Sequence, residues 1–222
     1  IFQFSDVPDS VHRAMHFVPF NRYDSWARRV MVDNKAKALI DENDTTSDNA
    51  THAPLVEYTP LDGFEGIKYD DDKRVHFIVV GMSKMGVAMG TQALFQAHYP
   101  NYVRDNSLKS RITFIDANAE QEMQFFKGRY ATLFELARHR YIDANACAKS
   151  EVESDYGWED PAEQSDYKWK HLSKEGKNFL DVEIEFVKGE LESDGVRDYL
   201  CRVTADKKSK VTIAICLPLT HQ

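Results

Sequence analysis

The stretch VHFIVVGMSKMGVAMG, residues 75–90, holds glycines at a spacing that suits phosphate binding. Its apolar run, residues 77–80, is bounded like a buried parallel strand, and Gly81 follows where the chain must turn tightly. A helical pattern comes next, and the N–H groups and dipole of its first turn favour a pyrophosphate near Gly86. We interpret the stretch as a dinucleotide-binding turn. The residues expected at the ligand are Gly81, Met82, Ser83, Lys84, Met85 and Gly86.

The turn departs from the usual G-x-G-x-x-G pattern at one position, because Ser83 stands where the second glycine is expected. A serine keeps the backbone amide and adds a hydroxyl, but its Cβ narrows the space above the turn. Gly90 falls on the same helix face as Gly86, which predicts close packing of the helix on its strand.

A second apolar stretch, RITFIDAN, ends in an acidic residue. Asp116, at the carboxyl end of the predicted strand, is placed to accept hydrogen bonds from ribose hydroxyls, together with its neighbours Ala117 and Asn118. Its charge would repel a 2′-phosphate, which favours NAD, NADH or another adenine nucleotide over NADP. The alternative is that Asp116 only caps the following helix. The glycine turn lies further from Asp116 than usual, and the polar loop 100–110 accounts for the excess.

Strands alternate with helices along residues 74–217, which predicts an α/β, Rossmann-like parallel sheet with right-handed crossovers. The expected elements are a helix over 86–98, a long helix over 119–141, a third strand over 181–187, a helix over 193–203 capped by Ser193, and a fourth strand over 211–217. Ligands of such sheets bind at the carboxyl ends of the strands. Gly189 and Glu190, directly after the third strand, therefore join the predicted site, although Glu190 could equally be an exposed acid near a helix N-terminus.

Residues outside this alternation form an N-terminal helical tail and a long acidic insertion. The expected domains are a tail and linker over 1–50 and a Rossmann-like domain over 51–222, with the insertion at 143–177 and tryptophans 158 and 169 inside it. A helix over 24–40 places Trp26, Val30 and Met31 on one side, which is typical of a core or subunit contact. The polar stretch 41–54 is interpreted as a linker.

Composition excludes several classes of function. The net charge of −8, with no basic stripe, argues against nucleic acid as a partner. No apolar run is long enough to span a bilayer, and no signal peptide is visible, which predicts a cytoplasmic location. The first residue is not methionine and the last follows a strand-like run, so we expect a segment of a longer protein whose membrane part lies outside it. The three cysteines show no C-x-x-C spacing, which predicts reduced structural thiols.

No catalytic or metal-binding constellation is found in the sequence. Tyr69 and Lys73 have the Tyr-x-x-x-Lys spacing of some dehydrogenases but precede the glycine turn. His12 and His16 are one helical turn apart, and we expect surface histidines rather than metal ligands. His139 is expected at a solvated helix end. The chain is therefore not expected to be an enzyme.

Taken in order, the segments GMSKMG, FID, FVKGE and VTIAICL resemble the regulator-of-K⁺-conductance (RCK, or TrkA-N) domains of potassium channels and transporters. The resemblance covers about residues 74–218 without the insertion. It implies a cytoplasmic domain that senses a nucleotide or ion and gates a membrane pore, with Gly81, Ser83, Met85 and Gly86 around a pyrophosphate. Asp116 would lie on the ribose, and Glu190 would replace the family's aspartate.

The resemblance also concerns assembly. The segment HFVPFNRYDSWARRVM resembles the end of a preceding RCK-like unit, which implies a tandem pair or a homodimer. We therefore expect a regulatory NAD- or adenine-nucleotide-binding domain linked to potassium ion transport. The alternatives are the NAD-binding half of an oxidoreductase, and a Rossmann relic that binds nothing and serves dimerisation.

Overall fold

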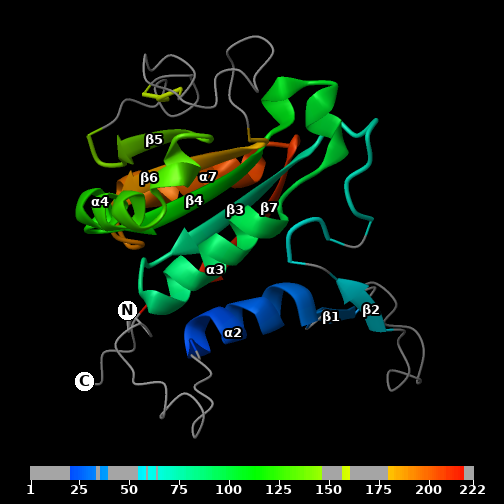
Figure 1. Cartoon of the computed structure of the whole chain (residues 1–222), viewed down its shortest axis with the longest axis horizontal. Helices are drawn as coiled ribbons and strands as arrows, with labels where there is room; N and C mark the ends of the chain where they lie inside the picture. The colour runs from blue at the N-terminus through cyan, green and yellow to red at the C-terminus, as the bar shows by residue number, and fades with distance from the viewer. Residues whose placement is uncertain are drawn as a thin grey trace, which may run out of the picture.

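The computed structural model describes residues 21–33, 36–39, 55–58, 60–63, 65–146, 157–160 and 180–217. Its centre is a five-stranded sheet with the order β5-β6-β4-β3-β7, in which all neighbours are parallel (Figure 1). The strands are β3 (Arg74–Val80), β4 (Ser110–Asp116), β5 (Arg138–Asp143), β6 (Val182–Lys188) and β7 (Ser209–Ile215). The predicted α/β class with a parallel sheet is confirmed.

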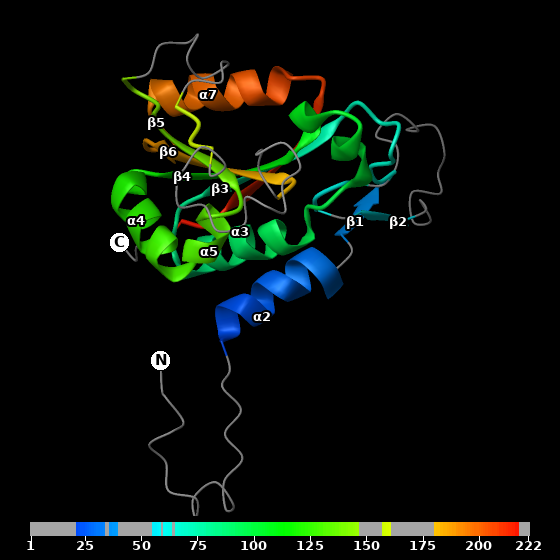
Figure 2. The same cartoon turned by 45° about the horizontal axis from the view of Figure 1, so that its top comes forward.

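Helices cover both faces of the sheet. Figure 2 shows α3 (Lys84–Gln96), α4 (Ala119–Arg129) and α5 (Ala131–Phe134) on one face and α7 (Asp194–Ala205) on the other. Helix α2 (Arg22–Arg28) lies against the outer side of α3, and β1 (Ala36–Leu39) pairs antiparallel with β2 (Leu55–Tyr58). Among the described residues, no helix combines the length and the apolar character needed to cross a membrane.

The sheet order is compatible with a Rossmann-like fold that has gained one strand. Without β5, the order β6-β4-β3-β7 is the 3-2-1-4 arrangement of the first four strands of a dinucleotide-binding sheet. Strand β5 adds to the outer edge of β6. The polar loop between α3 and β4 contains two short 3₁₀ turns, Pro100–Val103 and Asn106–Leu108, as the long spacing before Asp116 required.

The predicted helix over 119–141 is wrong in its second half. Helical structure ends at Phe134, and Arg138–Asp143 is strand β5. The side chain of Arg140 is 1% exposed and pairs with Glu185 of β6, so this segment becomes a strand because of a partner far away in the sequence. His139, expected at a solvated helix end, is only 3% exposed within β5.

The predicted helix over 24–40 is also shorter than expected. Asn21 caps α2 by accepting a hydrogen bond from the N–H of Tyr23 at 3.1 Å, so the helix begins before residue 24. A π-helical turn, Arg29–Asp33, follows α2, and Ala36–Leu39 is the strand β1.

Helix α2 has a packing partner inside the chain. Ala27 and Met31 are buried in the main apolar core that α3 shares, whereas Trp26 is 56% exposed. Of the predicted core or subunit contacts, Met31 is therefore a core contact within the chain, whereas Trp26 is not buried.

Several predictions concern residues outside the described part of the chain. They include the linker 41–54, His12, His16, Cys147, Trp169 and most of the insertion. Cys216 is half-buried and Cys201 is exposed on α7, and both are free thiols.

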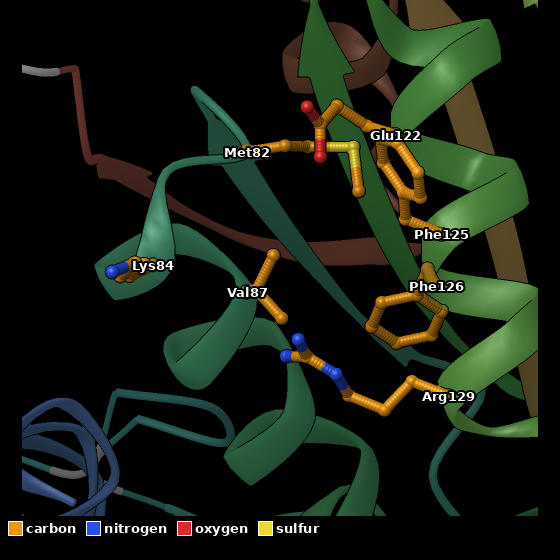
Figure 3. A pocket seen from close by; sticks show the side chains of 7 residues that line it. All are labelled: Met82, Lys84, Val87, Glu122, Phe125, Phe126 and Arg129. Carbon is orange, nitrogen blue, oxygen red and sulfur yellow. The ribbon is translucent and has the colours of Figure 1, made fainter. Parts of the chain in front are cut away.

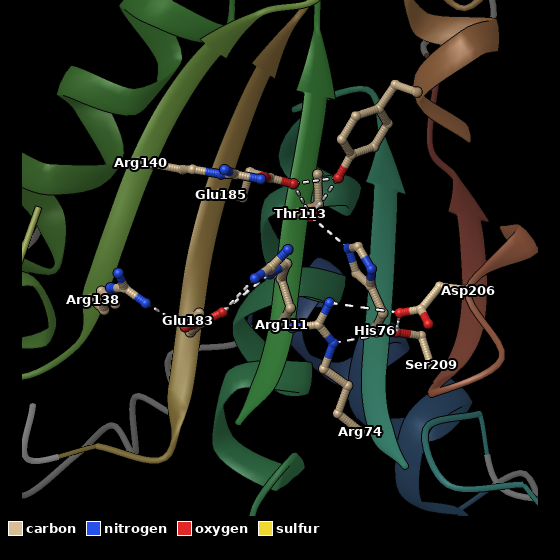
Figure 4. Close-up of polar contacts among 11 residues, drawn as sticks. Arg74, His76, Arg111, Thr113, Arg138, Arg140, Glu183, Glu185, Asp206 and Ser209 are labelled. Atoms are coloured by element: carbon tan, nitrogen blue, oxygen red, sulfur yellow. Dashed lines mark hydrogen bonds and ion pairs between the residues drawn. The ribbon is translucent and has the colours of Figure 1, made fainter. Parts of the chain in front are cut away.

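The face of the sheet under α7 carries a buried polar network centred on Glu185 (Figure 4). The Glu185 carboxylate pairs with Arg140 of β5 and accepts hydrogen bonds from Thr113 Oγ1 at 2.9 Å and from the hydroxyl of Tyr199 on α7. His76 Nε2 lies 2.8 Å from Thr113 Oγ1. The network therefore connects four strands of the sheet, β3, β4, β5 and β6, to helix α7.

A second row of charges lies beside the first on the same face. The carboxylate of Glu183 forms ion pairs with the guanidinium groups of Arg111, at 2.7 Å, and of Arg138, at 3.3 Å. Trp158, from the described piece of the insertion, stands over the guanidinium groups of Arg111, Arg138 and Arg140 at 4.8, 5.1 and 4.6 Å from its ring. Trp158 thus packs residues 157–160 against the sheet.

Burial shifts the acid–base behaviour of this network. Desolvation lowers the pKa of His76 from 6.5 to about 3. Desolvation alone would raise the pKa of Glu185, but Arg140 and Arg111 lower it to about 2. Both folded-state pKa values lie below the unfolded ones, so the unfolded state binds more protons as the pH falls, and stability is lost towards acid.

We predict that His76→Gln flattens the pH dependence of stability. Between about pH 7 and pH 5 the unfolded His76 gains a proton that the folded one does not, which lowers the wild-type free energy of unfolding by about 2 kcal/mol. Urea unfolding at both pH values measures the difference. His98→Gln is the control of opposite sign, because its hydrogen bond to Asp181 raises the pKa of His98. If the pH dependence of stability in His76→Gln equals that of the wild type, the lowered pKa of folded His76 is contradicted.

Candidate functional site

A cavity of about 390 Å³ lies at the carboxyl edge of the sheet, where β3, β4 and β6 end. The predicted residues that line it are Gly81, Met82, Ser83, Asp116, Ala117, Asn118, Gly189 and Glu190. The convergence of three strand ends that the sequence predicted is therefore present. We call this cavity the crevice.

The glycine turn is shaped by backbone contacts. Gly81 has φ of 94°, a conformation that suits glycine, and its N–H donates to the carbonyl of Ile115 at 2.8 Å. A Cβ at Gly86 would lie 1.9 Å from the carbonyl oxygen of Gly81. Residue 86 therefore has to lack a side chain, because α3 packs directly on the turn that precedes it. A side chain at Gly86 would therefore clash with the fold itself, with or without a ligand.

Two of the other glycine-turn predictions have clear outcomes. A Cβ at Gly90 would lie 2.3 Å from the ring of Phe114, which confirms close packing of the helix on the sheet. Met85 and Gly86 do not line the crevice; Met85 packs against the apolar core and Gly86 is buried.

Ser83, in the second glycine position, stabilises the start of α3. It is the N-cap of α3, where its hydroxyl accepts from the N–H of Gly86 at 3.3 Å and donates to the carbonyl of Cys216 at 2.7 Å. The hydroxyl therefore ties the glycine turn to the end of β7, and it remains at the wall of the crevice.

Asp116 fastens two loops together. Its Oδ2 accepts from the N–H of Met82 at 2.8 Å, and its Oδ1 accepts from the N–H of Asn118 at 2.8 Å. The helix α4 has Asn118 at its N-cap position, without a side-chain capping bond, so Asp116 is not the cap of this helix. Each carboxylate oxygen keeps a further acceptor site, because a carboxylate has about four in total.

The crevice is acidic. Asp116, Glu122, Glu190 and Glu192 all line it, and none of the lysines and arginines in the described part of the chain does. Glu190 is exposed, as one of its two readings expected, and still lies on the crevice wall. Six residues of the lining were not predicted, namely Val80, Ile115, Glu122, Leu191, Glu192 and Leu217. Glu192 shares its loop with Glu190, which is the only signal the sequence offered.

A smaller cavity of about 290 Å³ adjoins the crevice between the first turn of α3 and the side of α4 (Figure 3). It shares Met82 and Glu122 with the crevice. Its lining adds two cations, Lys84 and Arg129, to an apolar wall. In Figure 3 the guanidinium of Arg129 reaches from α4 towards Val87, whereas Lys84 points away from the cavity.

Positive and negative charge are therefore separated across the site. The start of α3 contributes the positive end of the helix dipole, beside Lys84. The crevice beyond it contributes carboxylates. A ligand with an anionic group at one end and hydroxyl donors at the other matches this division.

No protein family, curated protein or solved structure was found to match this chain. Among the described residues, no three His, Cys, Asp or Glu side chains come together as metal ligands would.

We predict that Gly86→Ala destabilises the protein without any ligand present. The added Cβ would force α3 away from the Gly81 carbonyl, and such overpacking costs about 3 kcal/mol or more when backbone must move. Urea unfolding gives the value. The matched control is Gly128→Ala in α4, where nothing lies within 4 Å of the new Cβ and the better helix former should stabilise by about 0.5–1 kcal/mol. Equal stability of Gly86→Ala and wild type would refute the contact.

Proposed function

We propose that this domain binds an adenine nucleotide, NAD or NADH in the first instance, in the crevice. The observation that carries the proposal is the position of Asp116 opposite the glycine turn, with both on the wall of one cavity at the carboxyl edge of a parallel sheet. Open α/β sheets bind their ligands at this edge.

The charges suggest how the ligand would lie. Its pyrophosphate would approach the N-terminus of α3, where Ser83 and Lys84 present backbone N–H groups and the dipole is favourable. Its ribose hydroxyls would donate to Asp116, which has acceptor capacity left after its two loop hydrogen bonds. Glu190 lies across the crevice and can accept a hydrogen bond from a second hydroxyl or an amine.

The acidic lining favours an unphosphorylated ribose. A 2′-phosphate next to Asp116 would meet like charge in a partly dry crevice, at a cost on the order of a few kcal/mol. Glu122, Glu190 and Glu192 add to the same repulsion.

A regulatory role fits this binding better than a catalytic one. Its basis is the sequence resemblance to domains that gate potassium channels and transporters, so the proposed effect of the nucleotide is on a membrane pore outside this segment. The competing proposal is a relic that binds nothing. It is favoured by Ser83, whose Cβ and hydroxyl occupy space that a glycine would leave open.

We predict that the wild type binds NADH at least about tenfold more tightly than NADPH, as the cost of the like charges requires. Isothermal titration calorimetry measures both affinities. Asp116→Asn should narrow the difference, and Glu65→Gln, at an exposed acid remote from the crevice, should leave it unchanged. Because asparagine offers an N–H₂ group where Asp116 accepts two N–H bonds, unfolding of each variant is measured alongside. Wild-type protein that gives no heat with NADH, NAD or ATP would leave the relic as the better reading.

A further inference from the structure

The outer edge of β7 carries exposed apolar side chains. Strand β7 pairs with β3 alone, and in the described residues no strand lies on its other side. Ile213, Ile215 and Leu217 are 40%, 64% and 49% exposed, whereas the apolar residues of β3 are almost completely buried. Parallel strands are normally covered on both faces, so this exposure is unusual.

The backbone of this edge is open in the same places. The N–H of Cys216 donates to the carbonyl of Val80 at 2.7 Å, which orients the even-numbered residues of β7 towards β3. Successive residues of a strand direct their N–H and C=O groups to opposite edges. Val211, Ile213 and Ile215 therefore direct their polar backbone groups outward, and their side chains lie on the face that α7 covers.

The usual protections of an edge strand are missing here. Charged residues, prolines and bulges normally prevent one sheet edge from pairing with another. The segment VTIAICL, residues 211–217, contains no charge and no proline in a chain in which 29% of the residues are charged. Lys210, the nearest lysine, donates to the carbonyls of Asp62 and Gly66 at 3.0 and 2.7 Å and so faces its own chain.

We propose that this edge pairs with the same edge of a second copy of the chain, antiparallel and around a two-fold axis at Ile213. In that register Ile213 lies opposite its own copy, and Val211 lies opposite the partner's Ile215. Every outward-directed residue then meets another outward-directed residue, so the backbone groups can exchange hydrogen bonds in pairs. Apolar side chains meet apolar side chains, and no like charges are opposed.

The sequence of β7 favours a second copy of the chain as the partner. An isologous interface requires a patch that is complementary to itself, and an uncharged strand with alternating apolar residues satisfies this condition when it is reversed. The two sheets would join into one, with both copies of α7 on the same face beside the paired isoleucines. Leu217, which continues β7, lines the crevice, so each crevice would lie next to one end of the interface.

Helix α2 is the other candidate for an interface, because the sequence favours a core or subunit contact there. Ala27 and Met31 are already buried in the core that α3 shares, so this side of α2 has a partner within the chain. Trp26 remains exposed on α2, so a dimer interface at Trp26 is the alternative that the experiment must test.

Sedimentation equilibrium of the whole chain is the deciding experiment, with three single variants. Ile213→Lys places two ammonium groups opposite each other across the two-fold axis, and we expect it to raise the dimer dissociation constant at least about tenfold. Trp26→Lys and Phe95→Lys, at side chains 56% and 66% exposed on α2 and α3, should leave the constant unchanged. Circular dichroism and urea unfolding confirm that each variant is folded.

Hydrogen exchange tests the register. The amides of Ile213 and Ile215 should exchange more slowly as the protein concentration rises through the dissociation constant, and that of Ala214, already directed at β3, should change little. A wild type that stays monomeric at high micromolar concentration would overturn the proposal, whether or not these amides are protected. So would a dimer that Trp26→Lys dissociates and Ile213→Lys does not.

Discussion

The carboxylate of Glu185 is the constraint on which the rest of the structure depends. It lies fully buried in the middle of the sheet, and a buried carboxylate without partners would cost several kcal/mol. Its partners come from three other elements: Arg140 from β5, Thr113 from β4 and Tyr199 from α7. Satisfying this one group therefore requires β5 at the outer edge of β6 and α7 across the face. That arrangement aligns the strand ends that form the crevice.

The walls of the crevice are held by the same residues that would contact a ligand. The Ser83 hydroxyl connects the glycine turn to the end of β7, and Asp116 connects that turn to the loop after β4. Gly86 lies under the carbonyl of Gly81. Because these residues stabilise the turn, substituting one of them changes the shape of the site as well as one contact. The stability of each variant must therefore be measured together with its affinity for the ligand.

The electrostatics of the site follow from its position on the fold. The N-terminus of α3 lies at one end, where Lys84 and Arg129 line the smaller cavity, and Asp116, Glu190 and Glu192 lie at the other, while Glu122 lines both cavities. An adenine dinucleotide with an unmodified ribose has phosphates and hydroxyl groups in a matching order. The open edge of β7 adjoins the crevice through Leu217, so binding and assembly would share one short segment.

The sequence by itself determined the strand, turn and helix at residues 75–96, the acidic end of β4, the cap of α7 at Ser193 and the parallel sheet, because these depend on local periodicity, on glycine and on capping side chains. Only the tertiary structure decided the strand β5, since the polar face of Arg138 and Arg140 becomes a buried strand face only where Glu183 and Glu185 neutralise it. The same holds for α2, whose length and buried side were set by α3 and by β1 pairing with β2. The tertiary structure also explains why residue 86 is a glycine, because its close contact is with the backbone of Gly81. The spacing of glycines in the sequence cannot distinguish that contact from one with a ligand.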